Sequence, residues 1–198
     1  MSYKRSALAA TLSLLAACGG DSVTSPIDAA LSGTVAFNFT GGGGGSFGAT
    51  GAITSAALAS SPFTTTWAAG YKDATDKTTN IAANVPKSAT TSDFVAITFN
   101  GQTASTGNIS PSCIDSSTTT CNAVGLLLGH SSSGSTFTSF CALTSGSITL
   151  SSISSTNATG SFSGSGTCVT ATGTSSAWVV TNGTLNVPLL PNVPSNLP

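Results

Sequence analysis

The sequence contains no glutamate and very little charge of either sign. Lys, Arg, Asp and Glu together make up 6% of the 198 residues, and the formal net charge is −1. A chain this poor in Lys and Arg offers no basic surface for a nucleic acid backbone, so nucleic acid binding is excluded as a function. Glycoside hydrolysis is also disfavoured, because that reaction commonly uses paired Asp or Glu side chains in an aromatic-lined cleft.

The chain also lacks any apolar run long enough to cross a bilayer as a helix. The apolar residues 6–17 follow Lys4 and Arg5 and number about a dozen, well under the ~20 that a membrane-spanning helix needs. A short apolar run behind positive charges is typical of a secretory signal. This run ends in Leu15-Ala16-Ala17-Cys18, which matches the lipobox of bacterial lipoproteins: small residues precede a cysteine whose thiol carries the lipid.

The N-terminal pattern predicts four segments. They are a lipoprotein signal peptide (1–17), an acylated Cys18 with a polar tether (18–30), a β domain (31–189) and a Pro-rich tail (190–198). Several acyl chains on Cys18 would anchor the chain to a membrane. The resemblance to bacterial lipoproteins also implies a location: Gly19, rather than Asp, follows the cysteine, which in such lipoproteins favours the outer membrane of the bacterial cell envelope. The alternative is an ordinary secretory signal that happens to contain a cysteine.

Four cysteines remain besides Cys18, and an even number in an exported chain predicts two disulfides. They are Cys113, Cys121, Cys141 and Cys168. Three connectivities are possible; we favour Cys113–Cys121, which closes a short Ser/Thr loop, and Cys141–Cys168, which joins two strands. A zinc site is the competing interpretation, but no C-x₂-C pair occurs and the sequence has a single histidine. No metal or other cofactor is therefore predicted.

Apolar and polar residues alternate with period 2 along much of the chain, which predicts β-strands. Strands are expected at 34–39, 47–58, 63–71, 93–100, 123–129, 136–144, 147–153, 158–169, 177–181 and 184–189, with 93–100 as a central strand and Asn182-Gly183 as a turn. Residues 72–92 are expected to form a long loop. The pattern favours an all-β fold, a single antiparallel β-sandwich or barrel-like domain without an amphipathic helix of useful length.

Three stretches in the last third of the chain carry a family resemblance. They are residues 146–153 (GSITLSSI), 158–162 (ATGSF) and 180–188 (VTNGTLNVP). They resemble the C-terminal half of uncharacterised bacterial surface lipoproteins, in which GTF-like strands precede a closing TNGTFDVP-like strand. Ser161 and Leu185 stand where Thr and Phe are usual. Those lipoproteins have no established activity, so the resemblance implies only a β fold and a place on the cell surface.

Three aromatic residues are the candidates for contact with a ligand. Trp67, Tyr71 and Trp178 lie on predicted strands, where exposed rings could stack on the sugars of a polysaccharide. Aromatic residues at alternating strand positions more often belong to the core. The core interpretation is favoured for all three.

Other motifs carry little weight. Residues 43–48 fit G-x-G-x-x-G formally, but the expected continuation is a strand and not the helix that dinucleotide binding needs. His130 lies among serines, and we expect a solvated loop histidine more than a hydrolase base. Asp73 and Asp76 with Asn80 could bind Ca²⁺ weakly, although solvated loop charge is favoured.

The function predicted from the sequence is a non-enzymatic cell-envelope lipoprotein with a structural or binding role at the membrane surface. One alternative is a carbohydrate- or polymer-binding module that uses exposed Trp or Tyr rings. Another is a self-assembling, adhesin-like subunit, since the low charge leaves few guards against pairing of exposed edge strands. An enzyme that works through His130 ranks last.

Overall fold

The computed structural model describes residues 32–60, 63–111, 121–131 and 136–191. The predicted signal peptide and tether, Cys18, Cys113 and most of the Pro-rich tail lie outside these residues. The elements are β1 (Ser32–Thr40), β2 (Gly45–Ala52), α2 (Ser55–Ser60), β3 (Trp67–Asp73), β4 (Thr78–Pro86), β5 (Thr91–Phe99), β6 (Ser105–Ile109), β7 (Ala123–Ser131), β8 (Ser139–Ile153), β9 (Asn157–Thr170) and β10 (Ser175–Pro188).

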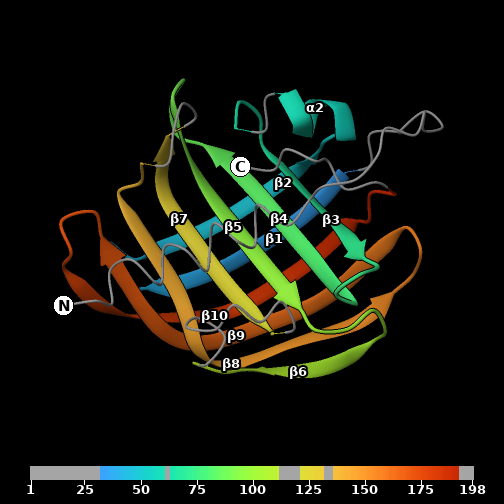
Figure 1. The fold of residues 1–198 in the computed structure, drawn as a ribbon. Helices are drawn as coiled ribbons and strands as arrows, with labels where there is room; N and C mark the ends of the chain where they lie inside the picture. Colours follow the sequence, from blue (N-terminus) through green and yellow to red (C-terminus); the bar gives the residue numbers. More distant parts are fainter. Residues whose placement is uncertain (1–31, 61–62, 112–120, 132–135, 192–198) are drawn as a thin grey trace.

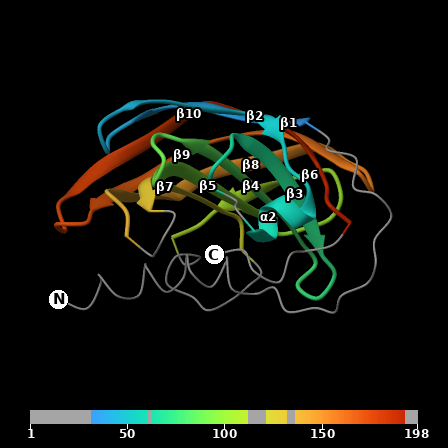
Figure 2. The same cartoon turned by 90° about the horizontal axis from the view of Figure 1, so that it is seen from above.

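One antiparallel sheet contains all ten described strands. Their order is β2-β1-β10-β9-β8-β7-β5-β4-β3, and β6 pairs with β8 beside this path. The sheet curls into a nearly closed, barrel-like sandwich, in which β1, β2 and β10 form one layer and β3, β4, β5 and β7 form the other (Figures 1 and 2). The antiparallel all-β fold expected from the period-2 pattern is confirmed.

The two ends of the sheet meet where β3 packs against β1, β2 and β10. The backbones come so close there that a Cβ on Gly33 would overlap with the carbonyl oxygen of Ala68. A Cβ on Gly51 would overlap in the same way with the carbonyl oxygen of Thr66. Glycine is needed at both positions, because any larger residue would push the two layers apart.

Aromatic and aliphatic side chains fill the space between the layers. In β1 every second residue is buried, beginning with Val35 and Phe37. The ring of Phe37 lies 5.2 Å from that of Phe47 on β2 and 5.5 Å from that of Phe162 on β9, measured between centroids. The alternation seen in the sequence therefore has its physical origin in one face of the sheet packing on itself.

A second apolar cluster covers the outer face of β3, β5, β7 and β8. Trp67, Phe94 and Phe140 contribute to it, and Leu58 of α2 packs on them. Figure 2 shows α2 on the side of this layer that faces away from β1 and β2. The hydroxyl of Thr54 accepts a hydrogen bond from the backbone N–H of Ala57 at 3.1 Å, which caps the start of this short helix.

Two predicted boundaries are wrong for local reasons. The loop expected at 72–92 contains β4, whose inward residues Ile81 and Ala83 continue the period-2 pattern with small side chains that gave only a weak signal. The strand expected at 47–58 ends at Ala52 and gives way to α2. The Ala- and Leu-containing sequence of α2 favours a helix once the chain leaves the sheet. β6 was not predicted.

Two pairs of predicted strands are each a single long strand with irregular pairing. Residues 136–144 and 147–153 join in β8, which has register shifts after Leu143 and Leu150. Asn182-Gly183 is not a turn, because β10 runs through it with a register shift between Val180 and Gly183. Asn182 has a φ of 54°, so the left-handed conformation that often marks a tight turn serves a β-bulge here.

Cys141 and Cys168 form a disulfide between β8 and β9, as predicted. The two residues are direct cross-strand partners, and both side chains belong to the core. The glycine run at residues 41–45 is a turn of positive φ values, and a Cβ on Gly42 would lie 2.7 Å from the Sγ of Cys168. This turn leads directly into β2, which confirms that the G-x-G-x-x-G match is accidental.

The closure of the sheet can be tested with two alanine substitutions on β2. Gly51→Ala should lower the free energy of unfolding by about 1–3 kcal/mol, because the methyl group overpacks the contact with β3. Gly48→Ala is the matched control, since its Cβ would meet no atom within 4 Å. Urea denaturation of both variants measures the difference, and equal stabilities would contradict this account of the closure.

The disulfide prediction compares two bridges of different loop length. Cys141–Cys168 closes a loop of 27 residues, for which loop closure predicts about 3–4 kcal/mol of stabilisation. We expect Cys141→Ala to lower the melting temperature more than Cys113→Ala does, because the predicted Cys113–Cys121 loop is much shorter. Calorimetry gives the ranking, and the reverse order would show that loop length does not govern these bridges.

Candidate functional site

The three aromatic residues proposed for ligand stacking are buried. Trp67 and Trp178 are 0% exposed and Tyr71 is 8% exposed. Trp178 packs in the interior between the layers, while Trp67 and Tyr71 belong to the cluster under α2. None of the three rings is available at the surface to stack on a sugar, so the interpretation as ligand-stacking residues is wrong and they are core residues.

His130 is not the solvated loop residue that the sequence predicted. It lies on β7 and is 8% exposed, with its ring centroid 4.8 Å from that of Phe63. Phe63 also contacts Phe94 edge-on, so its ring covers this part of the outer face. Burial removes water from the imidazole and lowers the pKa of His130 below its usual value of 6.5. Burial therefore favours the neutral form of the imidazole.

Two further polar side chains are buried on the outer face that carries His130. Ser92 on β5 is the direct cross-strand partner of His130, and Asn84 on β4 shares the same outer face. Among the described residues, no hydrogen-bond partner exists for Ser92 Oγ, His130 Nδ1 or Asn84 Oδ1, although Asn84 Nδ2 donates to the carbonyl of Thr65 at 2.8 Å. These three residues are the candidate site, because buried polar atoms without a partner are uncommon in a native fold.

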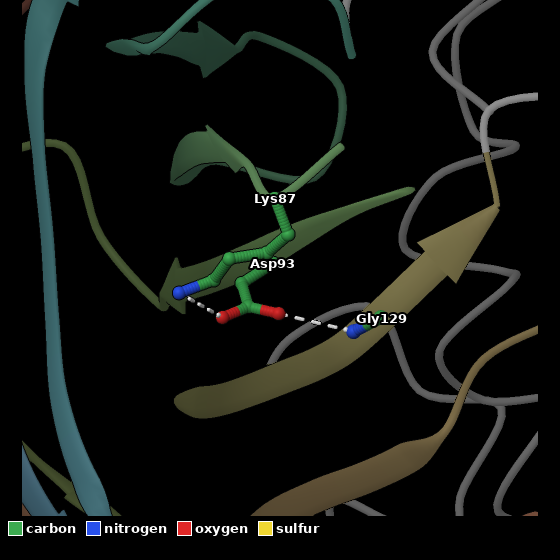
Figure 3. A network of polar contacts seen from close by, with 3 residues as sticks. All are labelled: Lys87, Asp93 and Gly129. Carbon is green, nitrogen blue, oxygen red and sulfur yellow. Dashed lines mark hydrogen bonds and ion pairs between the residues drawn. The ribbon is translucent and has the colours of Figure 1, made fainter. Parts of the chain in front are cut away.

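A polar network on the opposite face holds this arrangement in place (Figure 3). The Nζ of Lys87 lies 3.0 Å from the Oδ2 of Asp93, and the Oδ1 of Asp93 accepts a hydrogen bond from the backbone N–H of Gly129 at 3.0 Å. Gly129 has a φ of 60° and lies in a β-bulge, where β7 has one residue more than β5. The Asp93 carboxylate thus fixes the bulge.

The bulge decides which way His130 points. Leu126 and Leu128, four and two residues before His130 on β7, face the interior, and strict alternation would turn His130 inward as well. The extra residue at Gly129 shifts the alternation, so His130 reaches the outer face beside Ser92. Gly129 within a run of apolar residues was the one sequence signal for this bulge, and nothing in the sequence indicated Ser92 or Asn84.

A serine beside a neutral histidine can in principle act as a nucleophile and its base. Such a pair needs a third group that orients the imidazole and access for a substrate. Asp93 points to the opposite face from Ser92 and is held by Lys87 and Gly129, so it does not orient the imidazole. Ser92 is 0% exposed. Ser92 Oγ and His130 Nδ1 have no hydrogen-bond partner among the described residues, so the arrangement is a pair of buried polar side chains rather than a reaction centre open to substrate.

The remaining candidates are distributed over the fold. The carboxylate of Asp73 accepts hydrogen bonds from the backbone N–H groups of Thr75 and Asp76, which closes the turn between β3 and β4. In the described ranges, no group of three or more His, Cys, Asp or Glu side chains is placed to hold a metal ion. Cys121 is disulfide-bonded, and Cys113, its predicted partner, lies outside the described residues.

One half of the barrel carries no charged side chain. Residues 32–52 and 139–188, which form β1, β2, β8, β9 and β10, contain no Asp, Glu, Lys, Arg or His. Their outer face is covered by hydroxyl and amide groups, and neighbouring strands share hydrogen bonds such as Ser145–Ser165 at 2.9 Å. The exposed residues of this hydroxyl face are Thr34, Asn38, Thr40, Ser46, Thr50, Ser145, Ser151, Ser161, Ser163, Ser165, Thr167, Thr181, Thr184 and Asn186.

Comparison of the chain with protein-family models, curated proteins and solved structures found no match. Among the helices that the structure describes, none has the length and apolar character to cross a membrane. The similarity to surface lipoproteins noted in the sequence stays a prediction.

The burial of His130 predicts a pH dependence of stability. The pKa is lowered in the folded state, so the unfolded chain takes up the proton first as the pH falls below about 6.5, and the free energy of unfolding decreases. The slope from one proton is at most about 1.4 kcal/mol per pH unit. His130→Gln should lose this part of the decrease between pH 7 and pH 5.

Urea denaturation at several pH values measures the effect. All other titratable groups are the same in both proteins, so the difference between the two curves isolates the histidine. Parallel curves for the wild type and His130→Gln would contradict the burial of an uncharged imidazole.

Proposed function

We propose that this chain is a cell-envelope lipoprotein, held at the outer-membrane surface by acyl chains on Cys18, with a structural or binding role and no catalysis. The observation that carries the proposal is the Leu15–Cys18 box behind a charged and apolar leader. The tether of about a dozen polar residues leads to β1, which begins at Ser32. An exported, disulfide-bonded β domain is consistent with this location.

The similarity to surface lipoproteins supports the same proposal. The residues that carry it fall on β8, β9 and β10, three neighbouring strands of the sheet. They therefore form one continuous structural unit, as expected if the similarity reflects a shared fold and location.

The hydroxyl face supports a binding or structural role more than a chemical one. Hydroxyl and amide groups make hydrogen bonds of modest net strength, about 0.5–1.5 kcal/mol each, because water competes for them. A surface of this kind recognises a partner only through many contacts at once. Carbohydrate binding through Trp or Tyr rings is not favoured, because Trp67, Tyr71 and Trp178 are buried.

Lipid attachment is tested by Cys18→Ser. The wild-type chain should incorporate labelled palmitate and sediment with the membrane fraction, whereas Cys18→Ser should lose both properties because serine cannot carry the thioether-linked lipid. Cys141→Ala is the control, since it removes a cysteine but leaves the Leu15–Cys18 box intact. Retention of Cys18→Ser in membranes prepared without detergent would contradict the proposal.

A further inference from the structure

The two end strands of the sheet, β2 and β3, are protected to different degrees. The backbone N–H of Leu190, just after β10, donates to the carbonyl of Gly70 on β3, so that edge is partly occupied. β3 also carries Lys72 and Asp73 near its end. Among the described strands, β2 pairs with β1 alone, and Figure 1 shows it as the uppermost strand of the rear layer.

β2 lacks the charge, proline and bulges that usually keep an edge strand from pairing. Its sequence, GSFGATGA, contains no charged residue and no proline, and its pairing with β1 runs without a bulge from Ser32↔Ala52 to Phe39↔Gly45. Natural sheets protect exposed edges with charge, proline, bulges or a covering segment. Phe47 stacks on Phe37 at 5.2 Å and holds β2 flat against its neighbour, so the edge is regular.

We propose that β2 is a self-association edge, along which β2 of a second copy pairs antiparallel about a two-fold axis. The edge is its own complement, because backbone N–H and C=O groups of one copy meet those of the other in such a pair. No charged side chain on β1, β2 or β10 opposes the approach of an identical surface. The two-fold pairing uses both β2 edges, so association stops at a dimer and does not continue into a fibre.

A second copy suits this edge better than an unrelated partner. The hydroxyl face next to β2 has no charge to steer or select another protein, whereas an identical copy supplies the matching edge automatically. The contact is one strand of eight residues, smaller than the roughly 1,000 Å² expected of a stable interface. Confinement to a membrane surface raises the effective concentration of weakly pairing copies, a step that rests on the proposed acylation of Cys18.

The test uses the full, acylated chain with a fluorescent C-terminal tag in neutral phospholipid vesicles. Single-molecule photobleaching counts the copies in each complex. Gly48→Lys places a charge at the centre of the edge without a clash, because a Cβ there meets no atom within 4 Å. Ser46→Lys, at another exposed position of β2, is the second edge variant. Ser161→Lys is the matched control, since it adds the same charge to the hydroxyl face on the internal strand β9.

We expect two-step bleaching for the wild type and at least a tenfold weaker association for both edge variants, with Ser161→Lys like the wild type. A monomeric wild type, edge variants equal to the wild type, or an equal loss in Ser161→Lys would each overturn the proposal. If the chain does not remain on vesicles, the proposed acylation is wrong. Self-association is then measured by sedimentation equilibrium at high concentration. There, self-association that Gly48→Lys abolishes would support the edge, and a monomer would overturn it.

Discussion

The fold depends on the close approach of backbones where the curled sheet meets itself. β3 crosses the ends of β1 and β2 at van der Waals contact, and only the missing side chains of Gly33 and Gly51 make room for it. This contact sets the spacing of the two layers, and the spacing in turn lets Phe37, Phe47 and Phe162 interlock between them. With a wider spacing the same rings would leave gaps, each of which loses packing energy.

Once the sheet has closed, its outer face divides into two halves of different chemistry. The half formed by β3, β4, β5 and β7 carries the described charged residues at its rims and an apolar cluster that α2 covers. The other half is an uncharged surface of hydroxyl and amide groups. The first half, together with the start of β8, has buried apolar side chains on both faces. This explains why residues 93–100 looked like a central strand while β9 shows plain alternation.

The sequence was sufficient for the features that repeat and insufficient for those that depend on a single residue. Period-2 alternation indicated the antiparallel fold, and the position of Cys141 and Cys168 on two expected strands favoured the disulfide that is found. Bulges escaped prediction, because one extra residue reverses the inward and outward sense of everything after it. His130 was expected in a loop because it lies among serines, whereas β7 continues past the bulge to Ser131 and makes His130 the cross-strand partner of Ser92, a register that only the fold determines.

The positions of the acidic side chains explain why the described residues offer few groups for catalysis or ligand binding. Two of the three described aspartates are committed to backbone N–H groups: Asp73 to the turn after β3 and Asp93 to the bulge at Gly129. A carboxylate that accepts hydrogen bonds from the backbone is held in a fixed direction. It is then poorly placed to orient His130 or to bind a ligand. Recognition by this domain therefore depends on hydroxyl groups, amides and exposed backbone. These groups bind a partner through many weak contacts rather than through one strong contact.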